Sequence, residues 1–124
     1  MISDLRQLRA EVVASDRIGK RELDLICRRL YPEGRLGREV VEFLASIRRR
    51  VRSVSPAFEE FFAEAVKLNV LVDGAIDAKG ASWLRRLLRV GDGIDAGAKK
   101  LLGELQREAT RISPEFQRLY DESR

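Results

Sequence analysis

The chain of 124 residues contains no histidine, one cysteine and three prolines, and only 6% of its residues are aromatic. Without histidine it lacks the commonest general base, Ser-His and Cys-His nucleophile pairs, and the usual ligands of zinc and iron sites. Cys27 has no partner for a disulfide within the chain, and its place on an apolar stripe indicates a core residue. We therefore predict a protein that is not an enzyme and has no cofactor.

Long apolar runs are also missing. The longest, at residues 66–72, is interrupted by Lys67 and Asn69 and is too short to span a bilayer. The first residues contain no apolar segment of the kind found in secretory signals. We expect a cytoplasmic protein that is not transmembrane.

What the chain does have is helical periodicity. Hydrophobic residues make up 44% of the sequence and charged residues 35%, and the apolar positions recur at steps of three and four. The net charge is +4, and most of the excess positive charge lies before residue 56. The pattern predicts an all-α, compact seven-helix bundle that forms a single domain over residues 1–124. The helices are expected at residues 3–14, 19–30, 37–52, 56–72, 77–89, 95–111 and 114–121.

The helix expected at residues 56–72 is the most apolar one and should lie at the centre. Ser55 is a suitable N-cap, Pro56 suits the first helical position, and the helix should stop at Asp73 and Gly74. Its predicted buried face consists of Phe58, Phe61, Phe62, Ala65, Leu68 and Val72.

The two halves of the chain resemble each other. With a shift of 58 positions the two halves align without a gap, and Ser55 falls on Ser113 and Phe58 on Phe116. The matching Ser-Pro-x-Phe segments are the most specific part of this agreement. We predict an internal duplication, with two tandem repeats of roughly 1–58 and 59–124 that share the long central helix.

Four segments carry a resemblance to a known family: VDGAIDA (72–78), WLRRLL (83–88), DGIDA (92–96) and ISPEFQRLY (112–120). They resemble the bacterial TerB-like proteins, which are the tellurite-resistance TerB family and its relatives. The resemblance implies a small duplicated seven-helix protein, cytoplasmic and non-enzymatic. It also implies association with metal and with protein partners, in stress-response or membrane-associated assemblies.

The DGxID segments look like the second half of an EF-hand calcium loop. Asp73, Asp77, Asp92 and Asp95 are the candidate ligands for a divalent metal, but Gly80 stands where the loop would end in a glutamate. Asp77 and Asp95 also precede predicted helices, where aspartate is a good N-cap. Capping is the favoured interpretation, and a degenerate metal site is the alternative.

The densest basic run contains Arg48, Arg49, Arg50 and Arg52 at the end of the third predicted helix. These residues suit the negative end of the helix dipole. Alternatively, they bind nucleic acid or another polyanion through its phosphates, although no aromatic residue is interleaved for base stacking.

Trp83 and the basic residues Arg85, Arg86 and Arg89 mark the fifth predicted helix. Trp83 either closes the edge of the core or anchors a partner, because tryptophan is frequent in interface hot spots. The arginines form the polar face of the helix. Our leading hypothesis is a non-catalytic module that binds a protein partner or a second copy of itself at these four residues. Polyanion binding and divalent metal binding are the alternatives.

Overall fold

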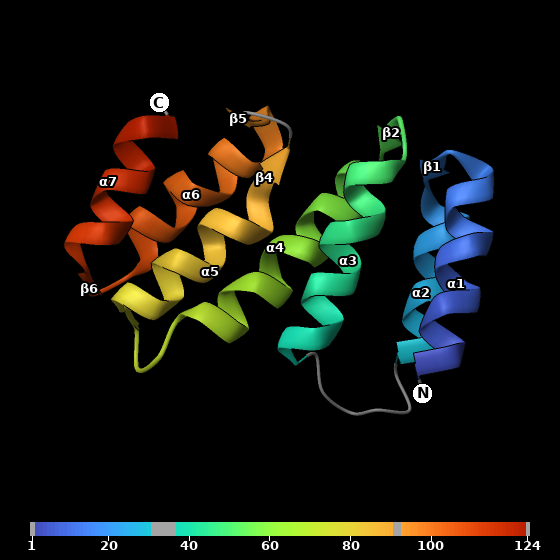
Figure 1. Ribbon diagram of the computed structural model, residues 1–124, viewed down its shortest axis with the longest axis horizontal. Helices are drawn as coiled ribbons and strands as arrows, with labels where there is room; N and C mark the ends of the chain where they lie inside the picture. Colours follow the sequence, from blue (N-terminus) through green and yellow to red (C-terminus); the bar gives the residue numbers. More distant parts are fainter. Residues whose placement is uncertain (1, 31–36, 91–92, 124) are drawn as a thin grey trace. The chain divides into compact units, whose positions relative to one another are not determined.

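The computed structural model describes residues 2–30, 37–90 and 93–123, and this part of the chain forms seven helices (Figure 1). Each corresponds to one expected from the sequence, and their ends differ from the expected ones by a few residues, so the all-α prediction is confirmed. The segment Tyr31-Pro32-Glu33-Gly34, whose proline and glycine predict a turn, lies outside the described residues. The helices are α1 (Ile2–Ser15), α2 (Lys20–Leu30), α3 (Arg38–Arg50), α4 (Pro56–Val70), α5 (Ala78–Leu88), α6 (Ala96–Glu108) and α7 (Pro114–Ser123).

Short β-segments of two residues join the helices, and the sequence did not predict them, because two residues show no alternation of apolar and polar positions. Pairing is parallel for β1 with β2 and for β3 with β6, and antiparallel for β4 with β5. The segments are β1 (Arg17–Ile18), β2 (Ser53–Val54), β3 (Ala75–Ile76), β4 (Arg89–Val90), β5 (Gly93–Ile94) and β6 (Arg111–Ile112).

The chain divides into two compact units, Met1–Ala65 and Val66–Arg124, called here the first and the second unit. The division falls inside α4, a few residues after the boundary near residue 58 that the sequence suggested. Helix α4 therefore begins in the first unit and ends in the second.

In the first unit, α1 packs against both α2 and α3 (Figure 1). The sequence predicts as inward residues Leu5, Leu8 and Val12 of the first helix, Leu23, Ile26, Cys27 and Leu30 of the second, and Val40, Val41, Leu44, Ile47 and Val51 of the third. Those whose side chains the structure describes are buried or half-buried. Fully buried side chains are Leu8, Val12, Ile18, Ile26, Val41, Leu44, Ile47 and Phe58.

In the second unit, α7 packs against α5 and also contacts α6. The sequence predicts apolar stripes of Ala81, Leu84, Leu87 and Leu88 in α5, of Ala98, Leu101, Leu102 and Leu105 in α6, and of Phe116, Leu119 and Tyr120 in α7. All of these residues are buried except Tyr120, which is half-buried. The buried side chains include Ala81, Leu84, Leu87, Leu88, Ala98, Leu101, Leu102, Leu105, Phe116 and Leu119.

The predicted buried face of α4 is right at its start and wrong at its end. Phe58, Phe62 and Ala65 are buried, but Leu68 is 73% exposed and Val72 is 58% exposed. The helix ends at Val70, two residues before the expected end, and Val72 instead pairs with Ala75. Asp73 and Gly74 do have the left-handed backbones expected of them, with φ of 53° and 79°, but they form the turn after the helix rather than its end.

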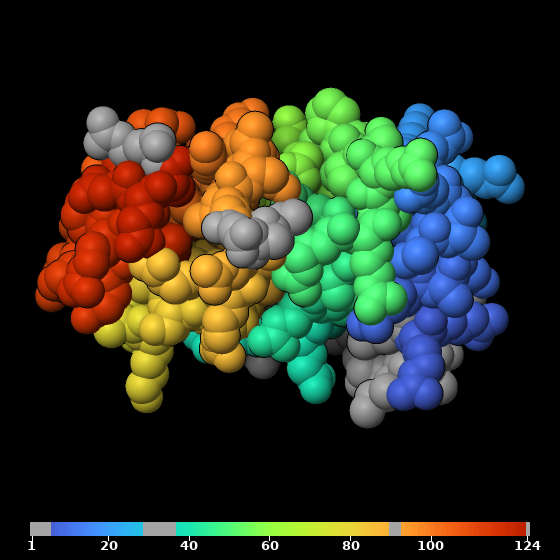
Figure 2. Space-filling view, turned by 45° about the horizontal axis from the view of Figure 1, so that its top comes forward, coloured from blue at the N-terminus to red at the C-terminus, as the bar shows by residue number. Residues whose placement is uncertain are grey.

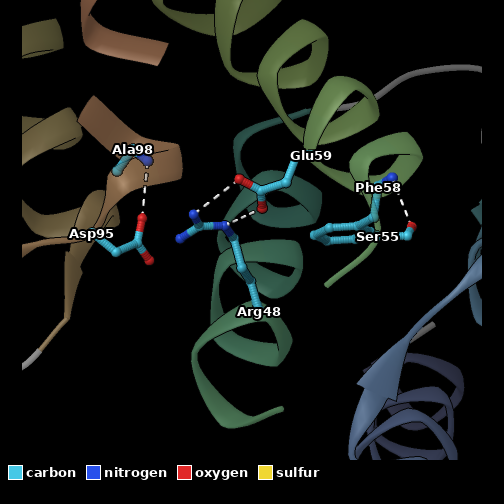
Figure 3. Close-up of polar contacts among 6 residues, drawn as sticks. All are labelled: Arg48, Ser55, Phe58, Glu59, Asp95 and Ala98. Atoms are coloured by element: carbon cyan, nitrogen blue, oxygen red, sulfur yellow. Dashed lines mark hydrogen bonds and ion pairs between the residues drawn. The ribbon is translucent and has the colours of Figure 1, made fainter. Parts of the chain in front are cut away.

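The backbone contacts recur at the spacing that the sequence repeat predicts. Ser55 N–H donates to the carbonyl of Ile18 at 2.8 Å, and Ser113 N–H, 58 residues later, donates to that of Ile76 at 2.9 Å. The serine hydroxyls accept from Phe58 N–H and Phe116 N–H, both at 3.2 Å, so both predicted caps are present (Figure 3 shows the first). The duplication itself remains a prediction that this spacing supports.

Candidate functional site

Arg48, the first member of the predicted polyanion surface, lies inside the first unit. Its guanidinium donates to both carboxylate oxygens of Glu59, from Nε at 2.6 Å and from Nη2 at 3.1 Å (Figure 3). It also lies over the ring of Phe62, 5.5 Å from the centroid, and only 7% of the Arg48 side chain is exposed. Arg48 is therefore a structural residue that joins α3 to α4.

The other three arginines of that run are exposed. Arg52 makes an ion pair of 3.2 Å with Asp16, but the two side chains are 89% and 48% exposed, so the pair contributes little to stability. The pairing of β1 with β2 brings Arg17, which is also exposed, beside this group. The basic surface thus loses Arg48 and gains Arg17, which sequence reasoning did not include.

The aspartates proposed as metal ligands have different positions and roles. Asp77 Oδ1 accepts from Gly80 N–H at 2.7 Å, and Asp95 Oδ1 accepts from Ala98 N–H at 2.9 Å, so both are the expected N-caps (Figure 3 shows Asp95). Asp73 is an exposed turn residue, and Asp92 lies outside the described residues. Among the residues that the structure describes, no three His, Cys, Asp or Glu side chains come together to hold a metal.

Trp83 differs in exposure from the two arginines of α5, Arg85 and Arg86, and from Arg89, which follows the helix in β4. Trp83 is 3% exposed, with its neighbours Leu84 and Leu87 also buried. A side chain covered to this extent offers almost no surface to a partner. Arg85, Arg86 and Arg89 are exposed, as expected for the polar face.

A pocket of about 330 Å³ opens beside two of these arginines. Its volume is at the lower end of the range of roughly 300–1,000 Å³ that is usual for ligand sites. In the space-filling view, α7 (red) lies beside α5 and α6 (yellow to orange), the helices that build the pocket (Figure 2). Its lining consists of Arg85, Arg89, Gly93, Ile94, Lys99, Leu119, Glu122 and Ser123.

The pocket carries three positive side chains and one negative one. Arg85 Nη1 lies 2.7 Å from Glu122 Oε2, and these side chains are 47% and 54% exposed. Arg89 and Lys99 are exposed and make no ion pair among the described residues. The electrostatic potential in the pocket therefore favours an anion.

Secondary structure fixes the walls of the pocket. Arg89 pairs with Ile94 across the antiparallel β4–β5 ladder, which holds the end of α5 near the start of α6. Lys99 lies in the first turns of α6, where Asp95 is the cap. Leu119, 1% exposed, supplies an apolar part of the wall from α7.

Sequence reasoning identified Arg85 and Arg89 but missed Lys99 and Glu122. One signal was available: Lys99 and Lys100 are cations near a helix N-terminus, where the dipole favours anions. A pair of cations in this unfavourable place indicates a role other than helix stability. Nothing in the sequence indicated that Glu122 lies beside Arg85, because that depends on how α7 packs on α5.

Cys27 is half-buried on α2. Burial, with a smaller effect from the charge of Asp24, raises the pKa of its thiol above the ordinary value. A raised pKa reduces the thiolate fraction at neutral pH, so this cysteine is a poor nucleophile.

No protein-family model matches the chain, and no match is found among curated proteins or solved structures. The TerB-like resemblance therefore remains a prediction from the sequence segments. No helix in the described part of the chain is both long enough and apolar enough to cross a membrane.

Proposed function

We propose that this protein is a non-catalytic helical interaction module of TerB-like type, which binds a protein partner through the arginine face of α5. The observation that carries the proposal is that Arg85 and Arg89 line a pocket with a surplus of positive charge. Arginine is enriched in protein interfaces, where its planar guanidinium binds carboxylates through two hydrogen bonds. Arg86, exposed on the same helix, extends the surface beyond the pocket.

The chemistry of the pocket argues against catalysis. Its one hydroxyl, on Ser123, donates to the carbonyl of Tyr120 at 2.7 Å and has no histidine to activate it. Its one carboxylate, on Glu122, is bound to Arg85. These groups suit binding of an anion rather than bond cleavage.

A cytoplasmic location is part of the proposal.

Photo-crosslinking from position 86 tests this function. A photoreactive amino acid replaces Arg86 in the full chain inside the producing cells, and a second variant carries it at the control position Glu115, an exposed residue of α7. We expect a discrete protein adduct from position 86 and none from position 115. An adduct of twice the chain's mass would identify self-association, and the absence of any light-dependent adduct at position 86 would contradict the proposal.

Polyanion binding is the second candidate, because Arg17, Arg49, Arg50 and Arg52 remain exposed in one region of the first unit. Titrating a labelled duplex and a single strand at two salt concentrations tests it. Binding that weakens steeply with salt and with the double variant Arg49→Ala/Arg50→Ala would support this candidate. Equal binding by the double variant would exclude these arginines as the site.

A further inference from the structure

Among the described residues that line the pocket of the second unit, Glu122 is the only carboxylate, and it pairs with one of the three cations there. The other two cations, Arg89 and Lys99, are exposed on the same pocket. The free protein thus contains a carboxylate that already occupies part of an anion site. An internal carboxylate in this position can compete with a ligand for Arg85.

We propose that Glu122 takes, in the free protein, the place of a carboxylate of the partner, and that the partner is an acidic peptide segment. When that segment binds, one of its carboxylates displaces Glu122 from Arg85, and its other carboxylates interact with Arg89 and Lys99. This inference rests on the proposed function, because it names the chemistry of the partner and a contact that limits its affinity.

The Arg85–Glu122 pair has the properties of a contact that can be exchanged. Both side chains are about half exposed, and ion pairs between exposed side chains contribute only about 0–1 kcal/mol. A partner with several carboxylates can form ion pairs with all three cations, whereas Glu122 forms one with Arg85 only. The partner therefore displaces Glu122, but breaking the Arg85–Glu122 pair lowers the affinity with which the partner binds.

The walls of the pocket favour a peptide over a small inorganic anion. Leu119 and the half-buried Ile94 give the pocket an apolar part beside its charged part. The methylene groups of glutamate side chains can pack there while their carboxylates reach the cations. An inorganic anion would leave these apolar walls unused.

The first half of the chain lacks the positive charges of this pocket, whereas Glu64 matches Glu122. The residues 58 positions before Arg85 and Lys99 are Cys27 and Val41, and the latter is fully buried. The residue that matches Leu119 is Phe61. The inferred site is thus a property of the second unit alone.

Fluorescence anisotropy with the full chain tests the inference. The probe is a dye-labelled peptide of eight glutamates, and a peptide of eight glutamines is the matched control. We expect the glutamate peptide to bind and the glutamine peptide not to bind. Replacing the two cations that Glu122 does not engage, in Arg89→Gln/Lys99→Gln, should weaken binding by about tenfold or more. The control Arg107→Gln/Lys79→Gln, which removes two exposed cations outside the pocket lining, should change it much less.

The decisive variant is Glu122→Gln. Removing the competing carboxylate should tighten binding of the glutamate peptide by about two- to fivefold, the amount expected for an exposed ion pair. Glu115→Gln makes the same change of charge on the same helix outside the pocket lining and corrects for the change in net charge. Thermal melts followed by fluorescence of Trp83 verify that each variant folds.

The results separate the inference from the proposed function. If Glu122→Gln binds no more tightly than Glu115→Gln, the competing role of Glu122 is wrong and the acidic partner stands. If the glutamate peptide fails to bind while crosslinking from position 86 yields a protein adduct, the acidic chemistry is wrong and the interaction module stands. If both fail, the proposed function fails as well.

Discussion

In the first unit the helices α2 and α3 follow glycines, whereas in the second unit α5 and α6 follow aspartates. Gly37 precedes α3 without any side-chain cap, and Asp95, the residue that matches it, caps α6 with its carboxylate. The backbone angles at the two positions are nearly the same, with φ of −78° and −76°. The same helix start is therefore built with and without a side-chain hydrogen bond.

At the other matched pair of helix starts, α2 and α5, the residue that supplies the side chain and the residue that supplies the backbone N–H are exchanged. At α2, Gly19 N–H donates to the side chain of Glu22 at 2.8 Å, and at α5 the side chain of Asp77 accepts from Gly80 N–H at 2.7 Å. Glu22 and Gly80 match in the repeat, as do Gly19 and Asp77. These are the two bonds of a capping box, and each unit retains one of them. The comparison teaches that the backbone frame recurs while the side chains that support it differ.

The largest effect should come from the matched core phenylalanines. Phe58 and Phe116 are both 0% exposed. Phe58→Ala and Phe116→Ala should each lower the free energy of unfolding by about 3–5 kcal/mol, because each leaves a large cavity. Denaturant unfolding measures this, with Trp83 fluorescence reporting the second unit and circular dichroism both units. A loss below about 1 kcal/mol for either variant would show that the two positions are not equivalent.

The second-largest loss of stability should come from breaking the Arg48–Glu59 ion pair of the first unit. Arg48 and Glu59 match Gln106 and Gln117 of the second unit. Arg48→Gln should lower the free energy of unfolding by about 2 kcal/mol, because it leaves the carboxylate of Glu59 partly buried without its cation. The double variant Arg48→Gln/Glu59→Gln, which copies the second unit, should recover part of that loss. A double variant as unstable as the sum of both single variants would contradict this view.

The caps should have a smaller effect, and they can be exchanged between the units. Asp95→Ala should destabilise by about 1 kcal/mol. Gly37→Asp should stabilise by about 0.5 kcal/mol, because no atom lies within 4 Å of an added Cβ and the backbone already has the capping conformation. Gly19→Asp is the less favourable control, since its Cβ would lie 3.2 Å from Glu22 Oε1. Equal effects of the two glycine substitutions would weaken the argument from backbone geometry.

The smallest effect on stability should come from deprotonation of Lys67, which occurs only at high pH. Burial lowers the pKa of Lys67, but its hydrogen bonds to Glu104 and Glu108, both at 2.8 Å, and their charges raise it above the ordinary 10.5. A raised pKa means that the contribution to stability is present below about pH 10.5 and is lost as the pH rises through the folded-state value. The wild type should therefore lose stability above this pH more steeply than Lys67→Met does. Parallel slopes of the two proteins in denaturant titrations at several pH values would refute the prediction.

Much of the fold could be predicted from the sequence because its signals are local. Ser55, Asp77 and Asp95 cap their helices as expected, and the apolar stripes of α5 and α6 are buried as expected. Leu68 lies within α4 but on its exposed side, and Val72 was assigned wrongly because the apolar pattern continues beyond the point where the helix ends. Local periodicity does not fix that point.

The site was harder to predict because it depends on packing between helices. Arg48 belongs to a run of exposed arginines in the sequence, and only the position of Glu59 on α4 explains its burial. Lys99 and Glu122 meet Arg85 and Arg89 because α7 packs on α5 and because β4 pairs with β5. These contacts join residues far apart in the chain, which single-sequence patterns do not encode.

The central claim is that binding belongs to the second unit and not to the arginine run of the first. Chemical-shift mapping by NMR, with the full chain and the peptide of eight glutamates, tests it most directly. We predict that the largest shifts surround the pocket, at Arg85, Ile94 and Lys99, while the matching Cys27 and Val41 do not move. Shifts concentrated at Arg49 and Arg50 would contradict it and would assign anion binding to the end of α3.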